Sequence, residues 1–227
     1  MPALPPFDRP LRAALFDLDG TLVDTLGDFV AALDAMLADL GRAPVPAATV
    51  ETLIGQGSEH LIRGVLAATG PAEAVAALEA PAWAAYQGHY RRLNGRRARI
   101  YPGAAAALGR AQAAGLQLAC VTNKPAEFAE ALLRHCGLRA PFALVCGGDT
   151  HPRKKPDPLP LQASCAALGV APAEALMVGD SSNDVRAARA AGCPVVLLSH
   201  GYNHGEPAQA AGADAVLDHF DQLWPTA

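Results

Sequence analysis

Short, almost uniformly apolar runs alternate with alanine-rich stretches of helical length from Tyr101 to near the end of the chain. Strands that are apolar throughout belong to parallel sheets whose two faces are covered by helices. We therefore predict a Rossmann-like, doubly wound α/β core. The expected strands are Leu116–Val121, Leu144–Cys146, Ala175–Val178, Val195–Leu198 and, with a fainter pattern, Ala215–Leu217. The expected helices, several followed by glycine, are Ala104–Ala114, Ala126–Cys136, Leu159–Leu168 and Asp184–Ala191.

The segment 24–99 lacks this alternation and is typical of helices throughout. Pro44 and Pro46 prevent the first of these helices from continuing. The expected helices are Leu26–Leu40, Ser58–Ala68 and Ala72–Leu93, with no strand among them. We predict an inserted all-helical cap, residues 24–99, on a core made of residues 1–23 and 100–227.

The composition of the 227 residues excludes some classes of function. A hydrophobic share of 51% is ample for a core, and a net charge of −4 gives no basic excess for binding nucleic acid. No stretch reaches the roughly 20 apolar residues of a membrane span. The five cysteines are odd in number and form no CxxC pair, which is typical of free thiols in a reducing compartment. We expect a cytoplasmic monomer or homodimer that binds neither nucleic acid nor membranes.

Two carboxylates one residue apart, Asp17 and Asp19, come just after the apolar segment Leu11–Leu15. Buried carboxylates are costly unless a cation shares their site, and both a metal ion and a phosphoryl-transfer site would account for the pair. Asp19-Gly20 taken alone is also an ordinary turn sequence.

Polar residues follow three later strands as well, and ligands of open parallel sheets bind at these carboxyl ends. A carboxylate can attack phosphorus, Mg²⁺ suits a site of carboxylate and phosphate oxygens, and a lysine and a hydroxyl can bind the phosphoryl oxygens. Taken singly, each segment also fits a helix start, a helix cap or a solvated loop. The segments are Thr122-Asn123, Lys155-Pro156 and Gly179–Asp184.

The chain resembles the haloacid dehalogenase superfamily, and within it the phosphoglycolate phosphatase branch. The four segments that carry the resemblance extend over most of the chain: Asp17–Asp24, Val121–Lys124, Lys154–Pro158 and Gly179–Asp184. The resemblance implies a mobile cap and a Mg²⁺-dependent hydrolase that forms an aspartyl-phosphate.

The resemblance also implies roles for single residues. Asp17 is similar to the family's nucleophile and Asp19 to its general acid and base. Family members place the phosphate-binding lysine directly before proline, which favours Lys155 over Lys154. The implied phosphate-binding set is Thr122, Asn123 and Lys155; the implied Mg²⁺ ligands are Asp17, Asp19 through its carbonyl, and Asp180; and Asp184 supports the site.

The expected reaction is hydrolysis of a small phosphorylated metabolite, with 2-phosphoglycolate as the favoured substrate. Asp19 argues against dehalogenase activity, and the absence of lysine from 24–99 argues against a phosphonoacetaldehyde hydrolase. A sugar-phosphate phosphatase, a mutase and a non-catalytic phosphate-binding regulator remain alternatives. The candidate substrate-selecting residues of the cap, which also fit a helix-entry turn and a solvated helix, are Gly55, Gln56, Gly57 and Arg63.

Overall fold

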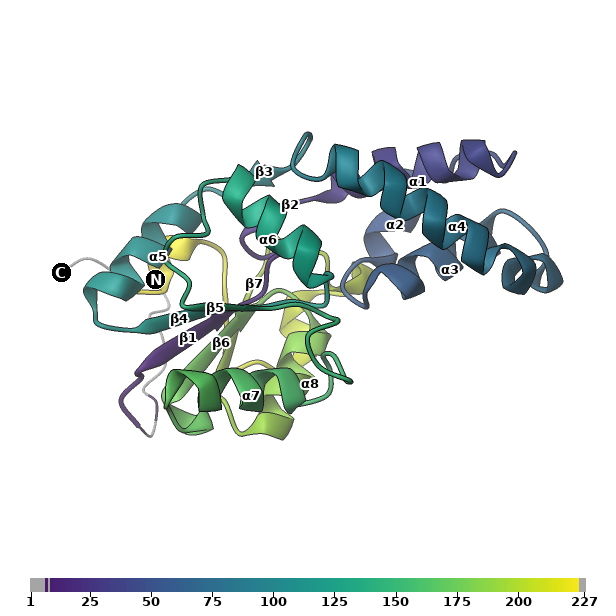
Figure 1. Ribbon diagram of the computed structural model, residues 1–227. Helices are drawn as coiled ribbons and strands as arrows, with labels where there is room; N and C mark the ends of the chain where they lie inside the picture. The colour runs from purple at the N-terminus through teal and green to yellow at the C-terminus, as the bar shows by residue number, and fades with distance from the viewer. Residues whose placement is uncertain (1–6, 8, 225–227) are drawn as a thin grey trace.

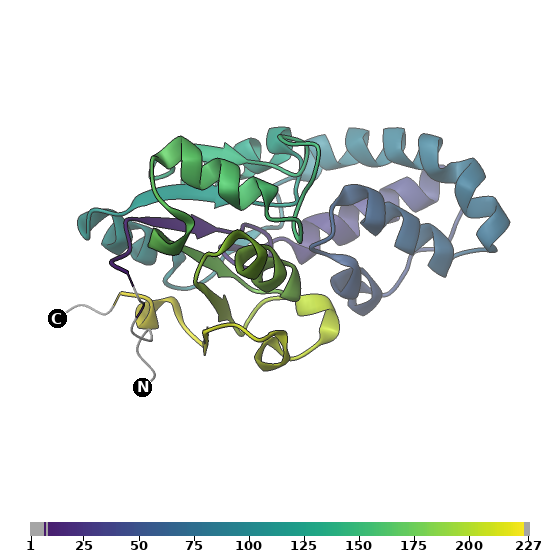
Figure 2. The same ribbon diagram turned by 90° about the horizontal axis from the view of Figure 1, so that it is seen from below.

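The computed structural model describes residue 7 and residues 9–224, and its centre is a parallel sheet of six strands. The strand order is β5-β4-β1-β6-β7-β8, so β1 lies in the middle and the chain moves outward in both directions (Figures 1 and 2). This arrangement confirms the doubly wound α/β core. The strands are β1 (Ala13–Phe16), β4 (Gln117–Val121), β5 (Leu144–Cys146), β6 (Ala175–Gly179), β7 (Val195–Leu198) and β8 (Ala215–Leu217).

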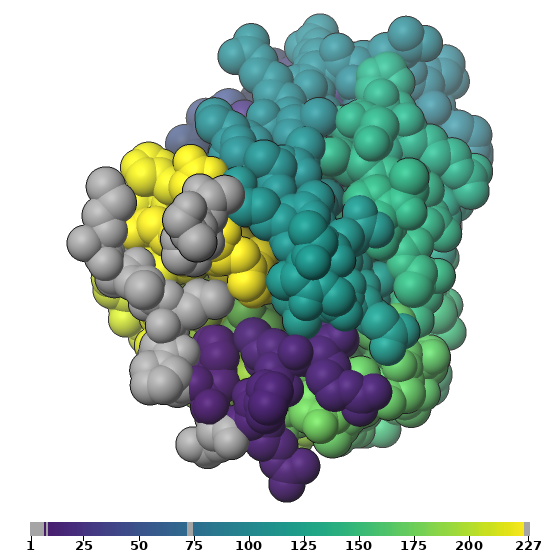
Figure 3. Space-filling view, turned by 90° about the vertical axis from the view of Figure 1, so that its left-hand side faces the viewer, coloured from purple at the N-terminus to yellow at the C-terminus, as the bar shows by residue number. Residues whose placement is uncertain are grey.

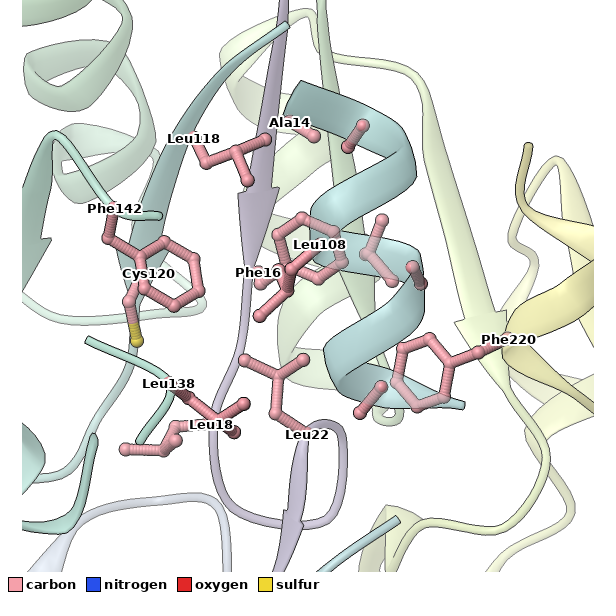
Figure 4. Packing of buried hydrophobic residues seen from close by; sticks show 14 of the residues in the cluster. Ala14, Phe16, Leu18, Leu22, Leu108, Leu118, Cys120, Leu138, Phe142 and Phe220 are labelled. Carbon is pink, nitrogen blue, oxygen red and sulfur yellow. The ribbon is translucent and has the colours of Figure 1, made fainter. Parts of the chain in front are cut away.

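Helices cover both faces of the sheet because successive side chains of each strand point to opposite sides. In β1, Ala14 and Phe16 pack in a cluster with α5 and α6, as Figure 4 shows for part of it, whereas Ala13 and Leu15 pack toward α7 and α8. Both sets are fully buried, which explains why the strands are apolar throughout. The helices are α5 (Ala104–Ala113), α6 (Ala126–His135), α7 (Leu159–Leu168) and α8 (Ser182–Ala191).

Four helices lie beyond the carboxyl ends of the strands, in the segment for which a cap was expected, and are called the cap below (Figure 1). They pack around a hydrophobic cluster of their own, in which the rings of Tyr86 and Tyr90 stack 5.2 Å apart. A two-stranded antiparallel ribbon connects the cap to the core, with Val23 opposite Ile100. The elements are α1 (Leu26–Asp39), α2 (Ala47–Leu53), α3 (Ser58–Ala68) and α4 (Ala72–Leu93), with β2 (Val23–Asp24) and β3 (Arg99–Ile100) as the ribbon.

Some local expectations differ from the structure. The first strand begins at Ala13 rather than Leu11, α8 begins at Ser182 rather than Asp184, and α2 was not expected. The ribbon also escaped prediction, because strands of two residues carry no recognisable periodicity. Four short 3₁₀ segments complete the described elements: Pro172–Glu174, Asn203–Gly205, Ala208–Ala211 and Phe220–Gln222.

The end of the molecule opposite the cap is formed by α5 together with segments from both ends of the chain (Figure 3). Trp224 packs there against Phe16 of β1, with ring centroids 6.2 Å apart. Within the described residues, no helix combines the length and the apolar character needed to cross a bilayer.

Candidate active site

Asp17 continues the pairing of β1 with β6 by one residue, because its N–H donates to the Val178 carbonyl at 2.9 Å. Side-chain oxygen Oδ1 accepts the Leu18 N–H at 2.7 Å and lies 3.1 Å from Lys155 Nζ. The contacts of Asp17 within the described residues use Oδ1, so Oδ2 is left available to react. Burial, partly offset by the Lys155 charge, raises the pKa of Asp17 to about 6.

Lys155 is held behind Asp17 by three acceptors. Its Nζ donates to the Val121 carbonyl and to Asp184 Oδ1, both at 2.7 Å, in addition to its contact with Asp17. The ammonium group is almost completely buried, and these acceptors offset the loss of water around it. The choice of Lys155 over Lys154 remains a prediction from the motif, but Lys155 is the one that contacts the candidate nucleophile.

Asp184 links the lysine to the loop after β6. Its Oδ2 accepts the Ser181 N–H at 3.1 Å and the Ser181 hydroxyl at 2.9 Å, and it lies 3.3 Å from the Asp180 amide nitrogen. The helix-cap role and the active-site role considered for Asp184 are therefore compatible, since each of its two oxygens serves one of them.

Asp180 is held by groups from two distant segments. Thr21 Oγ1 donates to Oδ1 at 2.7 Å, and the Tyr202 N–H donates to Oδ2 at 2.9 Å. Gly20 makes the close approach possible: its φ is +81°, and a Cβ there would stand 2.6 Å from Asp180 Oδ2. Burial, followed by the charges of Asp184 and Asp17, raises the pKa of Asp180 well above its usual range.

Three buried carboxylates therefore lie close together, and the one ammonium group beside them contacts two, Asp17 and Asp184. Oxygens of Asp17, Asp180 and Asp184 lie within 4.8 Å of one another, and Lys155 balances only one of the three charges. A net charge of −2 surrounded by hard oxygen donors fits a divalent cation such as Mg²⁺. Asp17 keeps one oxygen without a donor and Asp180 is bound by neutral donors only, whereas Asp184 has the Lys155 ammonium group on one oxygen and the Ser181 donors on the other; Asp17 and Asp180 are therefore the better ligands.

Asp19 follows β1 by three residues and is bound by a second lysine, Lys124. Lys124 Nζ donates to its two oxygens at 2.8 and 3.1 Å, and the Thr25 hydroxyl donates to Oδ1 at 2.8 Å. The same Nζ is 2.6 Å from the Tyr90 hydroxyl and 4.5 Å from the centre of the Phe29 ring. Phe29 and Tyr90 belong to the cap, so a cap surface surrounds this core lysine.

A small cavity separates the cap from the strand ends. About 20 Å³ of it is open to the centre of a water-sized molecule, which is room for one or two waters. Thr122 and Asn123 line it; Asn123 Nδ2 donates to the carbonyls of Gly55 and Lys155, and its buried Oδ1 has no partner among the described residues. The lining residues are Asp17, Asp19, Phe29, Ile54, Gly55, Gly57, Ser58, Leu61, Thr122, Asn123 and Lys124.

The four candidate cap residues have different surroundings. The Gly55 carbonyl also accepts the Asn183 side-chain amide at 3.2 Å, so the glycine loop contacts the core directly. Gly57 has φ +92°, and a Cβ there would stand 2.7 Å from Lys154 Nζ. Gln56 is half-buried and is not among the lining residues. Arg63 lies on the cap surface in a two-bond contact with Glu79, at 2.8 and 3.1 Å.

The sequence interpretation assigned no role to Lys124, Tyr90 or Tyr202. Lys124 is one of only three lysines in the chain and directly follows two candidate phosphate ligands, which was a usable signal. Tyr90 had no such signal, because its contact with Lys124 joins residues 34 positions apart. Tyr202 Oη accepts the N–H groups of Thr25 and Leu26 and so anchors the start of α1.

A parallel sheet whose first strand ends in a buried carboxylate, with a lysine and further carboxylates beside it and a helical cap above, defines a class of metal-dependent hydrolases. The chain belongs to the haloacid dehalogenase-like hydrolase family, whose model matches residues 11–192. The resemblance identified in the sequence is thereby confirmed.

Individual relatives extend this result over nearly the whole chain. The phosphoglycolate phosphatase of Thiobacillus denitrificans is 45% identical over 211 residues, covering 93% of each chain. A solved structure described as a predicted phosphoglycolate phosphatase from Haemophilus somnus is similar with a TM-score of 0.86 at 32% identity, covering 92% of this chain and 95% of that one. CbbY from Rhodobacter sphaeroides, solved in complex with phosphate, has a TM-score of 0.78 at 30% identity, with the same coverage.

Proposed function

We propose that this protein is a Mg²⁺-dependent phosphatase that hydrolyses 2-phosphoglycolate to glycolate and inorganic phosphate. The observation that carries the proposal is that Asp17, whose side-chain contacts among the described residues use only Oδ1, lines one small cavity with Asp19, Thr122 and Asn123. Relatives at 40–45% identity are phosphoglycolate phosphatases, which supports both the reaction and the substrate.

The proposed reaction uses two carboxylates in different roles. Asp17 attacks phosphorus, the bond from phosphorus to the glycolate oxygen breaks, and Asp19 gives its proton to that oxygen. Asp19, now a carboxylate, takes a proton from the water that hydrolyses the aspartyl-phosphate. The Thr122 hydroxyl is the proposed donor to the phosphoryl oxygens, and Asn123, whose side-chain amide donates to the Gly55 and Lys155 carbonyls, is proposed to support the phosphate site beside it.

Mg²⁺ would be held by Asp17, Asp180 and the Asp19 carbonyl, and would supply positive charge to the phosphoryl group. Lys155 contributes a fixed charge behind the nucleophile, and Asp184 holds that lysine in place. Repulsion between a dianionic phosphate and Asp17 is offset only when both positive groups are present.

The cap is the proposed selector of the substrate. We assign it residues 24–99, with the β2–β3 ribbon as its connection to the core, and propose that the Gly55–Gly57 loop closes over the ligand. The closed cavity has room for only one or two waters, so the cap would have to move to admit any ester; Lys124 is the only cation among the described residues that line it. A bisphosphate, which a mutase must hold, would need more positive charge. Arg63 would have to leave Glu79 to take part.

The state of the cysteines supports a proposal for the cellular compartment of the protein. The five of them are free thiols, which is typical of proteins in a reducing environment, and we propose the cytoplasm.

A panel of phosphate monoesters tests the function. The purified protein with Mg²⁺ should release phosphate from 2-phosphoglycolate with a kcat/KM at least about tenfold above that for hexose phosphates, nucleotides and xylulose 1,5-bisphosphate. A preference for a larger ester would refute the substrate and leave the reaction class intact. Release of no phosphate from any ester would favour a non-catalytic role.

A further inference from the structure

Lys124 is an unusual feature of the candidate site. It is the only positively charged side chain among the described residues that line the cavity, and its ammonium group is almost completely buried. The other two lysines nearby form ion pairs away from the cavity. Lys155 pairs with Asp17 and Asp184 behind it, and Lys154 pairs with Glu59 outside it.

The surroundings of Lys124 fix the position of its ammonium group but provide only one carboxylate to balance its charge. The hydroxyl of Tyr90 and the rings of Tyr90 and Phe29 enclose Nζ on the cap side, at 2.6, 4.8 and 4.5 Å. Aromatic rings attract a cation but leave its charge available to an anion. Asp19 is the only carboxylate in contact with Nζ among the described residues, and it keeps a second donor in the Thr25 hydroxyl.

The proposed substrate carries one negative group besides its phosphate. In 2-phosphoglycolate the carboxylate is separated from the phosphate oxygen by a single carbon, so both groups must lie together between the cap and the strand ends, where the closed cavity has to widen to admit them. A buried carboxylate without a cationic partner is strongly disfavoured. Among the described residues lining the cavity, Lys124 is the side chain that meets this requirement.

We propose that Lys124 determines substrate specificity by exchanging its contact with Asp19 for the carboxylate of the substrate. This inference rests on the proposed function and assigns to one core residue the selectivity that the cap loop alone does not explain. Tyr90 acts as a positioning residue: it holds the ammonium group in the cavity when the cap is closed over the core.

The test compares two substrates and three variants. The substrates are 2-phosphoglycolate and its neutral amide, which has the same size and no negative charge beyond the phosphate. Lys124→Met keeps the length of the side chain and removes its charge. Lys154→Met is the matched control, because Lys154 adjoins the glycine loop without lining the cavity. Tyr90→Phe keeps the charge and removes only the hydroxyl group.

Wild-type enzyme should prefer 2-phosphoglycolate to the amide. Lys124→Met should raise KM for 2-phosphoglycolate about 10- to 150-fold, the loss typical of a hydrogen bond between charged groups, and change KM for the amide less than about threefold. Lys154→Met should change neither. Tyr90→Phe should raise KM for 2-phosphoglycolate by about three- to tenfold, without affecting the amide.

Several outcomes would overturn the inference. A wild-type preference that Lys124→Met retains, or equal losses on both substrates, would exclude Lys124 as the carboxylate ligand, and so would loss of the preference in Lys154→Met. If Lys124→Met fails to fold, Tyr90→Phe decides by the same comparison. Wild-type enzyme that hydrolyses other phosphate esters but not 2-phosphoglycolate would refute the proposed function, and this inference with it.

Discussion

The substitution Asp180→Asn tests the charge balance of the metal site. In the metal-free protein, the carboxylate of Asp180 faces those of Asp17 and Asp184, and oxygens of all three lie within 4.8 Å of one another. Lys155 contacts Asp17 and Asp184, whereas Asp180 accepts hydrogen bonds but has no cation in contact with it among the described residues. Asn keeps the shape of the side chain and removes its charge, so metal-free stability and metal binding should respond in opposite directions.

The magnitude follows from these distances. Two like charges about 5 Å apart repel by about 3 kcal/mol at an effective dielectric constant of about 20. Asn in place of Asp180 loses one acceptor for the Thr21 hydroxyl or the Tyr202 N–H, which costs about 1 kcal/mol. The variant should therefore be about 2 kcal/mol more stable than wild type without metal, or about 4–8 °C higher in Tm.

Thermal unfolding of both proteins, in EDTA and in excess Mg²⁺, measures the effect. At pH 8, where ionised carboxylates repel most strongly, Asp180→Asn should melt above wild type in EDTA. Mg²⁺ at about 100 times its Kd should stabilise wild type by about 2.7 kcal/mol, or about 5–10 °C, and should leave the variant nearly unchanged. The difference between the two melting temperatures should therefore become smaller, or change sign, when the metal is added.

Two results would refute the reasoning. If Asp180→Asn melts below wild type in EDTA, the three carboxylates do not repel one another as the distances indicate. If Mg²⁺ stabilises the variant as much as wild type, Asp180 is not a ligand. Asp214→Asn is a suitable control, because Asp214 precedes β8 at the edge of the sheet opposite the carboxyl ends of the strands; it pairs with Arg189 and accepts the Val195 N–H, so its loss should lower Tm equally in EDTA and in Mg²⁺.

Three further predictions concern the nucleophile and the cap. Asp17→Asn should lower kcat by at least about a thousandfold with an unchanged circular dichroism spectrum, and near-normal phosphate release, with deamidation excluded, would remove Asp17 from its role. Because the pKa of Asp17 is raised to about 6, its protonation favours the folded state and should add about 1 kcal/mol to metal-free stability in urea from pH 7 to pH 5; since the pKa of Asp180 is raised as well, the rise should be smaller by about that amount in Asp17→Asn rather than absent. Tyr202→Phe leaves the Thr25 N–H without its acceptor, whereas the Leu26 N–H keeps Asp24 Oδ1 at 3.1 Å, and should lower the free energy of unfolding by about 1–3 kcal/mol; a fall in Tm below about 2 °C would contradict this.

The core strands were predictable to within a residue or two, because a buried parallel strand requires an apolar side chain on each face. Val195–Leu198 is such a run, and it is β7 in the structure. The helix α2 and the β2–β3 ribbon were not predictable in this way. Ala47–Leu53 has only seven residues, of which Val50 alone is buried, so it presents little apolar periodicity.

Residues at the strand ends could be identified because each one directly follows a recognisable apolar run. Asp17, Thr122 and Asp180 therefore reach one edge of the sheet once the strands are parallel. Their partners could not be identified: the hydroxyl that holds Asp180 comes from Thr21, 159 positions earlier, and Lys124 meets the cap through Tyr90. Such contacts follow from how the cap packs on the core, and no local pattern records that packing.

The amino-acid sequence by itself determined the sheet, the helical insertion and the order of polar residues along the strand ends, since burial and periodicity act locally. Only the tertiary structure decided which charges meet. It brought three carboxylates together, two of them in contact with one lysine, and enclosed the second lysine between a core carboxylate and two cap rings. The physical reason is that Coulomb interactions and desolvation depend on distance in space, which packing of remote segments sets.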